Sequence, residues 1–300
     1  MSKDQIRHLI ASRTVRDGLT ESGIGGVRLF RATQAIPCVP ALYEPCVVAI
    51  VSGAKEAILD GRRYVYDESQ YLCCPMSMPV QAGTPTATAE TPLYGVLVSL
   101  DLRVMTELTL EMENAGGILP SDKDGLREPG IRLAYWDAMF TDALLRLLAL
   151  EPSSTDMAVL GKVRLRELCY AILKGEAGIF ARRAFGAGNA IARSIAHVSS
   201  QLDAQISIDD MATRAGMSRA AFHRKFKQVT TMAPIQFVKS MRLNMAAMNI
   251  AGGMTVNEAA IAVGYLSPSQ FSREFKRMYG QSPRHWCDMH QGTVEVSKIR

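Results

Sequence analysis

The feature that most constrains this chain is an internal duplication in its last third. Residues 222–227 read FHRKFK, and residues 271–276 read FSREFK, 49 positions later. The similarity continues upstream of both hexamers and includes Gly216 in the first copy and Gly264 in the second. A match of this extent indicates that one supersecondary unit occurs twice, and its identity decides the architecture of this region.

Each copy predicts two short helices separated by a glycine-containing turn. The patterns SIDD at 207–210 and TVNE at 255–258 are typical of a capping box at the start of a first helix, although an aspartate makes the first box the weaker. The glycine ends that helix because it adopts a positive φ at little cost. Ser218 and Ser267 then cap the second helices. This order is the signature of a helix-turn-helix motif.

The second helix of each copy carries two phenylalanines on one face and an arginine on the other. Phe222 and Phe226 are four residues apart and share a face, whereas Arg224 lies roughly 200° away around the helix. The second copy repeats this arrangement around Arg273. We interpret the two segments as recognition helices. The alternative is a pair of amphipathic surface helices with solvated charges.

Charge is distributed unevenly along the 300 residues, whose net charge is +5. From residue 189 onward there are 14 lysines and arginines against 7 acidic residues, and the preceding part carries 20 against 22. A basic domain joined to a near-neutral one is typical of a nucleic-acid-binding protein. The chain is long enough for two domains.

Other compositional features exclude several classes of protein. No apolar run approaches the roughly 20 residues of a membrane span, and the first twenty residues lack the apolar stretch of a signal peptide. We therefore expect a cytoplasmic protein that has no membrane partner. The six cysteines form no CxxC pair, which argues against a zinc site and favours reduced thiols.

The first two-thirds of the chain predicts a β-rich domain with flanking helices. From about residue 27 to 101, short runs of Val, Ile, Leu and Tyr alternate with turn residues, and Asp60-Gly61 is a hairpin signal. Helical periodicity follows at 101–112, 131–150 and 156–173. The predicted fold is therefore an α+β N-terminal β-barrel with flanking helices, followed by an all-α domain of two helix-turn-helix units joined by a linker helix. We place the boundary in FGAGN, giving domains 1–185 and 186–300.

Two stretches of the repeat, ISIDDMATRAGMSRAAFHRKFK and EAAIAVGYLSPSQFSREFKRMYGQSPRHW, resemble the C-terminal DNA-binding domain of the AraC/XylS family of bacterial transcription regulators. LYEPCVVAIVSGAKEAILDGRRYVYDESQYL resembles one type of the family's N-terminal region through its Tyr-Glu-Pro, Gly-x-Lys and Tyr-x-Tyr landmarks. The resemblance implies a cupin-like barrel that binds a small effector and forms a homodimer. It also implies double-stranded promoter DNA and RNA polymerase as partners, with the recognition helices in successive major grooves and a linker helix at about 234–250.

The resemblance also implies which side chains meet DNA. Arginine can bind a guanine edge with two hydrogen bonds, and lysines more often contact phosphates. Ala220 is smaller than the residues common at its position, so the first helix is expected to contact fewer bases. The candidates for base contacts are Ala220, His223, Arg224, Ser269, Ser272 and Arg273. The candidates for phosphate contacts are Lys225, Lys227, Lys239, Arg242, Lys276 and Arg277.

The effector itself is not readable from the sequence. Cys73 and Cys74 are adjacent on a predicted strand, so they face opposite sides of it, and Cys46 belongs to the same region. These thiols are either apolar core residues or sensors of oxidants and electrophiles. A barrel enzyme with a basic tail is a further alternative. No histidine lies between His8 and His197, which excludes an ordinary metal-dependent cupin, so we expect no enzyme, metal or cofactor.

Overall fold

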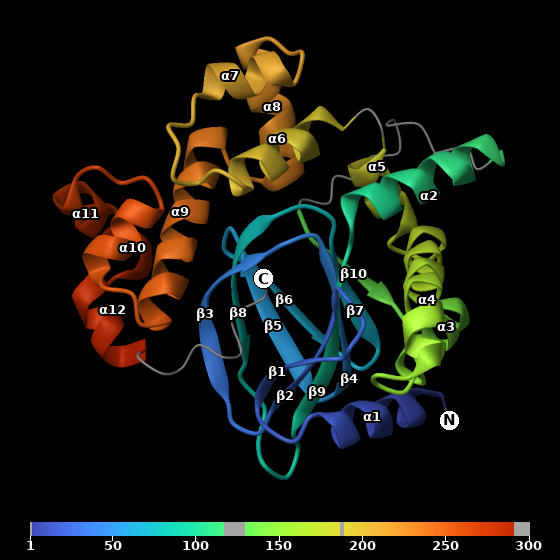
Figure 1. The fold of residues 1–300 in the computed structure, drawn as a ribbon. Helices are drawn as coiled ribbons and strands as arrows, with labels where there is room; N and C mark the ends of the chain where they lie inside the picture. The colour runs from blue at the N-terminus through green and yellow to red at the C-terminus, as the bar shows by residue number, and fades with distance from the viewer. Residues whose placement is uncertain (1, 117–129, 187–188, 291–300) are drawn as a thin grey trace.

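The computed structural model of the chain describes residues 2–116, 130–186 and 189–290. The first part contains two antiparallel sheets, one with the strand order β1-β2-β9-β4-β7-β10 and the other with the order β3-β8-β5-β6 (Figure 1). The strands of the described residues are β1 (Gly18–Glu21), β2 (Val27–Ala32), β3 (Ile36–Tyr43), β4 (Cys46–Ser52), β5 (Ala54–Leu59), β6 (Arg62–Asp67), β7 (Gln70–Cys74), β8 (Met78–Thr84), β9 (Leu93–Ser99) and β10 (Arg132–Tyr135).

Strand alternation explains how the two sheets pack. On β4, Cys46, Val48 and Ile50 belong to the apolar cluster between the sheets, whereas Val47 and Ala49 belong to a second cluster beneath the helices. A sheet that is buried on both faces needs apolar residues at every position, which is why this strand reads CVVAIV. The two sheets share no ladder among the described residues, so the predicted β-rich domain is confirmed as an open sandwich rather than a closed barrel.

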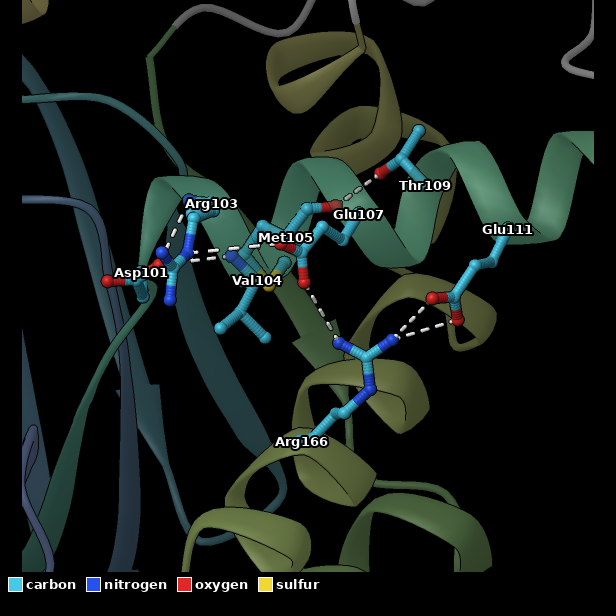
Figure 2. A network of polar contacts seen from close by, with 8 residues as sticks. All are labelled: Asp101, Arg103, Val104, Met105, Glu107, Thr109, Glu111 and Arg166. Carbon is cyan, nitrogen blue, oxygen red and sulfur yellow. Dashed lines mark hydrogen bonds and ion pairs between the residues drawn. The ribbon is translucent and has the colours of Figure 1, made fainter.

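Within the described ranges, five helices accompany the sandwich. The outer face of the six-stranded sheet is covered by α1, α3 and α4, and α2 and α5 lie at one end (Figure 1). Salt bridges connect α2 to α4, because Arg166 pairs with Glu107 at 3.6 Å and with Glu111 at 2.7 Å (Figure 2). The helices are α1 (Ser2–Arg13), α2 (Leu102–Asn114), α3 (Ala138–Leu148), α4 (Thr155–Lys174) and α5 (Gly178–Phe185).

The helix predicted at 131–150 is wrong at its beginning. Residues Arg132–Tyr135 form β10, which pairs with β7 so that Leu133 lies opposite Leu72. Helix α3 begins only after Asp137, whose carboxylate accepts a hydrogen bond from the backbone N–H of Phe140 at 2.7 Å. The apolar periodicity of residues 132–135 is compatible with a helix. These residues form a strand instead, because they pair with the edge of β7. The helices predicted at 101–112 and 156–173 are confirmed as α2 and α4.

The second part is helical. Its elements are α6 (Ala190–Ser199), α7 (Ile208–Arg214), α8 (Arg219–Thr230), α9 (Pro234–Ala251), α10 (Val256–Ala262), α11 (Pro268–Tyr279) and α12 (Pro283–His290). The pairs α7–α8 and α10–α11 are the two predicted helix-turn-helix units, and α9 is the predicted linker helix. Gly216 and Gly264 have φ values of 65° and 81°, as the turns require. Among the described residues, no helix combines the length and hydropathy that crossing a bilayer requires.

Candidate nucleic-acid interface

The second helices of the two units, α8 and α11, are built alike. Ser218 and Ser267 cap them by accepting hydrogen bonds from the backbone N–H groups of Ala221 and Gln270, both at 3.3 Å. The rings of the two phenylalanines in each helix have centroids 5.4 Å apart in α8 and 5.5 Å apart in α11. All four rings are buried, so the opposite side of each helix faces outward. The local prediction for both helices is confirmed.

The residues predicted to contact bases lie on that outward side. Arg224 and Arg273 are exposed, and neither guanidinium has a hydrogen bond or ion pair within the described part of the chain. Ala220 and Ser269 are also exposed at the beginnings of the two helices. His223 and Ser272 are half-buried beside them. The structure thus groups these residues into one trio for each helix, and their contacts with bases stay a prediction.

The six candidates for phosphate contacts divide into two groups. Lys225, Lys227, Lys276 and Arg277 are exposed. In contrast, Lys239 and Arg242 on α9 are engaged within the protein. Nε of Arg242 donates to the carbonyl oxygen of Leu202 at 2.9 Å, and Nη2 donates to that of Ala204 at 2.6 Å. Burial lowers the pKa of Arg242. Through these two hydrogen bonds, the guanidinium of Arg242 connects the loop before α7 to the linker helix α9.

Glu274 holds the second unit together. Its carboxylate pairs with Nζ of Lys239 on α9 at 3.0 Å and accepts a hydrogen bond from the Tyr265 hydroxyl at 2.7 Å. Burial acts to raise the pKa of Glu274, but the hydrogen bonds from Tyr265 and Lys239 outweigh it and keep that pKa below its usual range. The sequence analysis did not find this role, because spacing along α11 does not reveal a partner on α9.

The linker helix α9 packs against the four-stranded sheet at β3 and β8 (Figure 1). Asn244, only 2% exposed, donates to the carbonyl oxygens of Ala41 at 2.9 Å and Val80 at 2.8 Å. Ala41 and Val80 are register partners on the two strands. The Asn244 amide oxygen accepts a hydrogen bond from Tyr279 at 2.7 Å. The sequence could have indicated this contact, because Asn244 is a polar residue among the otherwise apolar buried residues of α9.

The three cysteines considered as thiol sensors are buried. Cys74 lies in the cluster between the sheets and Cys73 in the cluster beneath the helices, so the predicted opposite orientation is confirmed. Cys46 is the register partner of Cys74. Burial raises the pKa of Cys73 to about 12, and it also raises the pKa values of Cys46 and Cys74. Because the thiolate is the reactive form, these environments give no support to a thiol sensor, which stays an untested hypothesis.

A cavity of about 340 Å³ lies where the sandwich meets the helical part. It is lined by the loops at 44–45 and 75–77 of the sandwich and by Ala192 and Ala196 of α6. Leu102 and Thr106 of α2 complete it. The hydroxyl of Thr106 donates to the carbonyl oxygen at the end of α5, which fixes this part of the lining. The cavity has the size and mixed lining of a small-molecule site.

Comparisons with known proteins agree with this geometry. Residues 23–180 match the family described as AraC-type transcriptional regulator N-terminus, and residues 211–289 match a helix-turn-helix domain. The HTH-type transcriptional regulator MtrA of Neisseria gonorrhoeae is 39% identical over 77 residues, which are 25% of this chain and 26% of MtrA. The regulatory protein SoxS of Escherichia coli is 29% identical over 90 residues, which are 30% of this chain and 84% of SoxS. The chain thus spans about a quarter of the length of MtrA.

Solved structures show the same arrangement of both parts. ToxT from Vibrio cholerae has a TM-score of 0.56 at 12% identity, with 92% of this chain and 100% of ToxT covered. A ToxT structure with a bound unsaturated fatty acid has a TM-score of 0.53 at 14% identity and covers 90% of this chain and 96% of that one. These similarities concern the fold. The N-terminal match spans more than half of the residues, and together with the duplicated helix-turn-helix unit it shows that the chain belongs to the AraC-type family of DNA-binding transcription regulators, which are not enzymes.

Proposed function

We propose that the chain binds specific promoter sites as a homodimer in the cytoplasm, contacts RNA polymerase there, and is controlled by a small-molecule effector held by its N-terminal part. In this proposal residues 1–185 are the effector-sensing and dimerisation domain, and residues 186–300 are the DNA-binding domain. The two trios around the exposed Arg224 and Arg273 support sequence-specific binding. Each presents a guanidinium that is free to meet a base edge.

The contact of Asn244 with the sheet is the observation that carries the proposal of effector control. Helix α9 connects the two helix-turn-helix units, and its buried amide is hydrogen-bonded to β3 and β8. A further hydrogen bond joins the N-terminal part to the helical part, since the backbone N–H of Gly130 donates to the carbonyl oxygen of Val229 on α8 at 2.9 Å. A ligand that alters the sandwich would therefore change how both recognition helices are presented to DNA.

Effector binding is supported by the junction cavity and by the fold. ToxT has been solved with an unsaturated fatty acid, so this architecture accommodates a small ligand in that protein. In this chain the cavity is lined by both the sandwich and α6. A ligand held between the two sheets would also influence α9, because the carbonyl oxygens bound by Asn244 belong to strands of that sandwich.

The homodimer is supported by an exposed apolar stripe on α4. Val159 and Val163 are one helical turn apart and are 65% and 59% exposed. Replacing both with lysine should convert the dimer to a monomer in sedimentation experiments. Val15, which is 80% exposed on another surface, provides the control substitution to lysine. A wild-type protein that sediments as a monomer at high concentration would contradict this part of the proposal.

DNA binding is tested with fluorescent duplexes from the region upstream of the chain's own gene, in excess non-specific competitor. The wild type should bind a discrete site, and a variant with Arg224→Ala and Arg273→Ala should lose the preference for that site. Arg103→Ala on α2 removes an exposed arginine from the first part of the chain and serves as the control. Equal affinity of the wild type for the site and for scrambled DNA would refute the proposed function.

A further inference from the structure

Three neighbouring strands of the four-stranded sheet present polar side chains at the same level. Lys55 on β5 is the direct register partner of Tyr66 on β6. On its other side β5 pairs with β8, where Glu56 lies opposite Gly83, so Lys55 and Thr84 are next in register. We call Lys55, Tyr66 and Thr84 the polar row. Directly opposite residues of an antiparallel pair share a face, so the three side chains point the same way.

The polar row faces the space between the two sheets. Lys55 alternates along β5 with Glu56 and shares its face with Ala57, which belongs to the inter-sheet cluster. Tyr66 is itself in that cluster. The row is almost completely removed from solvent, with exposed fractions of 4% for Lys55, 1% for Tyr66 and 0% for Thr84.

None of the three polar groups has a hydrogen-bond partner within the described residues. The hydroxyls of Tyr66 and Thr84 are buried and unsatisfied. The hydroxyl of Tyr43 lies near that of Tyr66, but the two do not form a hydrogen bond. Among the described residues the ammonium of Lys55 has no ion-pair partner, and it lies over the ring of Phe30, whose centroid is 5.8 Å away.

In the part of the chain that the structure describes, no carboxylate pairs with Lys55. The adjacent Glu56 points to the opposite face of the sheet, where both of its oxygens accept hydrogen bonds from Arg63 at 2.6 and 2.7 Å. Burial lowers the pKa of Lys55 to about 8. A buried amine and two buried hydroxyls that lack partners among the described residues are costly to folding, so a ligand that satisfies them would stabilise the protein.

We propose that the polar row binds the carboxylate of a small organic acid whose remaining part is apolar. The ammonium of Lys55 pairs with the carboxylate, and the hydroxyls of Tyr66 and Thr84 donate hydrogen bonds to its oxygens. A single cation matches a monoanion rather than a phosphate dianion. The surrounding inter-sheet residues, among them Phe30 and Ala82, match an apolar remainder. This inference rests on the proposed function, because it identifies the effector class and its place.

Strand β8 connects the polar row to the DNA-binding part. Thr84 lies at one end of this strand, and the carbonyl oxygen of Val80, four residues earlier, accepts the hydrogen bond from Asn244. Strand β5 pairs with β8 between these two positions. A ligand that tightens the contact between Lys55 and Thr84 thus acts on the same strand on which α9 is docked.

Octanoate is the probe, with octanol as the uncharged analogue and octyl phosphate as the dianion. Octanoate should raise the Tm of the full chain in a dose-dependent manner and change its affinity for its DNA site, and octanol should do neither. Lys55→Met should weaken the octanoate effect at least tenfold. Tyr66→Phe and Thr84→Val should weaken it by smaller factors. Lys162→Met, which removes an exposed lysine from α4, should respond like the wild type.

Several outcomes would overturn the inference. Octanol or octyl phosphate acting as well as octanoate would exclude a carboxylate site, and so would an undiminished response in Lys55→Met. A response that survives Lys55→Met but disappears in Ala196→Trp would place the ligand in the junction cavity instead. If no probe shifts the Tm while specific DNA binding persists, the inference fails and the regulator proposal stands. If specific DNA binding is absent, the regulator proposal fails, and the Tm shifts still decide the inference.

Discussion

The side-chain amide of Asn244 donates a hydrogen bond to the carbonyl oxygen of Val80, 164 positions earlier in the chain, at 2.8 Å. This contact joins the middle of the linker helix to a strand of the sandwich. Hydrogen-bonded buried amides are sensitive to substitution because loss of one partner leaves the others unsatisfied. Asn244 thereby docks α9 on the four-stranded sheet, and the proposed effector control depends on this contact.

Asn244→Leu should destabilise the protein by about 2–4 kcal/mol, because it leaves two strand carbonyls and the Tyr279 hydroxyl without their partner. It should also change DNA affinity in the absence of any effector. Urea unfolding and fluorescence anisotropy measure the two effects. Asn249→Leu, at a half-buried position of the same helix, is the control and should stay within roughly 0.5 kcal/mol of the wild type. An undisturbed DNA affinity in Asn244→Leu would argue against the coupling.

Arg273→Ala should weaken specific DNA binding by about 1–3 kcal/mol and relax the preference at one base position, because the exposed guanidinium is the group suited to a guanine edge. Lys276→Ala, one turn further along α11, should weaken binding to all sequences alike and reduce the salt slope by about one. Affinities for a set of single-base variants of the site, measured at several salt concentrations, separate the two effects. An unchanged specificity ratio in Arg273→Ala would refute the base-contact assignment.

Arg242→Met tests whether this residue contacts DNA phosphate or serves the fold. Its guanidinium is already bound to the carbonyl oxygens of Leu202 and Ala204. We therefore expect a loss of stability of about 1–3 kcal/mol, with the salt slope of DNA binding unchanged. A slope reduced by about one unit at unchanged stability would instead support the phosphate contact. Lys227→Met at an exposed position provides the comparison for a phosphate contact.

Lys55→Met should stabilise the ligand-free protein. Burial lowers the pKa of Lys55 from 10.5 to about 8, so below pH 8 the folded state bears the full cost of a buried ammonium, roughly 3 kcal/mol. Between about pH 8 and 10.5 the unfolded chain binds more protons than the folded one, and wild-type stability should rise with pH relative to Lys55→Met. Urea unfolding of both proteins at pH 7 and pH 9.5 measures this difference. A constant difference would show that Lys55 has an ordinary pKa.

The buried thiols should resist modification. Burial holds Cys46, Cys73 and Cys74 in the protonated form, so N-ethylmaleimide should label them far more slowly in the folded protein than in urea. Oxidants and aldehydes should leave DNA affinity unchanged, in the wild type as in a triple serine variant. Mass spectrometry of labelled peptides and anisotropy provide the two measurements. A response of the wild type that the triple variant lacks would instead establish the thiol sensor.

The sequence alone determined the helical part in detail. Capping serines, turn glycines and the pairs Phe222–Phe226 and Phe271–Phe275 act over distances of a few residues, so a local pattern specifies each helix-turn-helix unit. The alternation along the strands likewise predicted a β-rich first part, and it required Cys73 and Cys74 to face opposite sides. The helix caps, the turns and the alternation of side chains along a strand all follow from local backbone geometry, so a short stretch of sequence is enough to predict them.

The tertiary structure decided which polar groups are free and which are engaged. Nothing along α9 indicates that Arg242 and Lys239 are bound within the protein whereas Lys225 is exposed, because their partners come from other elements. The strand at Arg132–Tyr135 formed because the edge of β7 was available to it. Lys55 became a buried amine without an ion-pair partner among the described residues because strand alternation placed Glu56 on the opposite face and the second sheet closed over Lys55. Burial and pairing arise from segments that are distant in the chain, and a local pattern does not contain them.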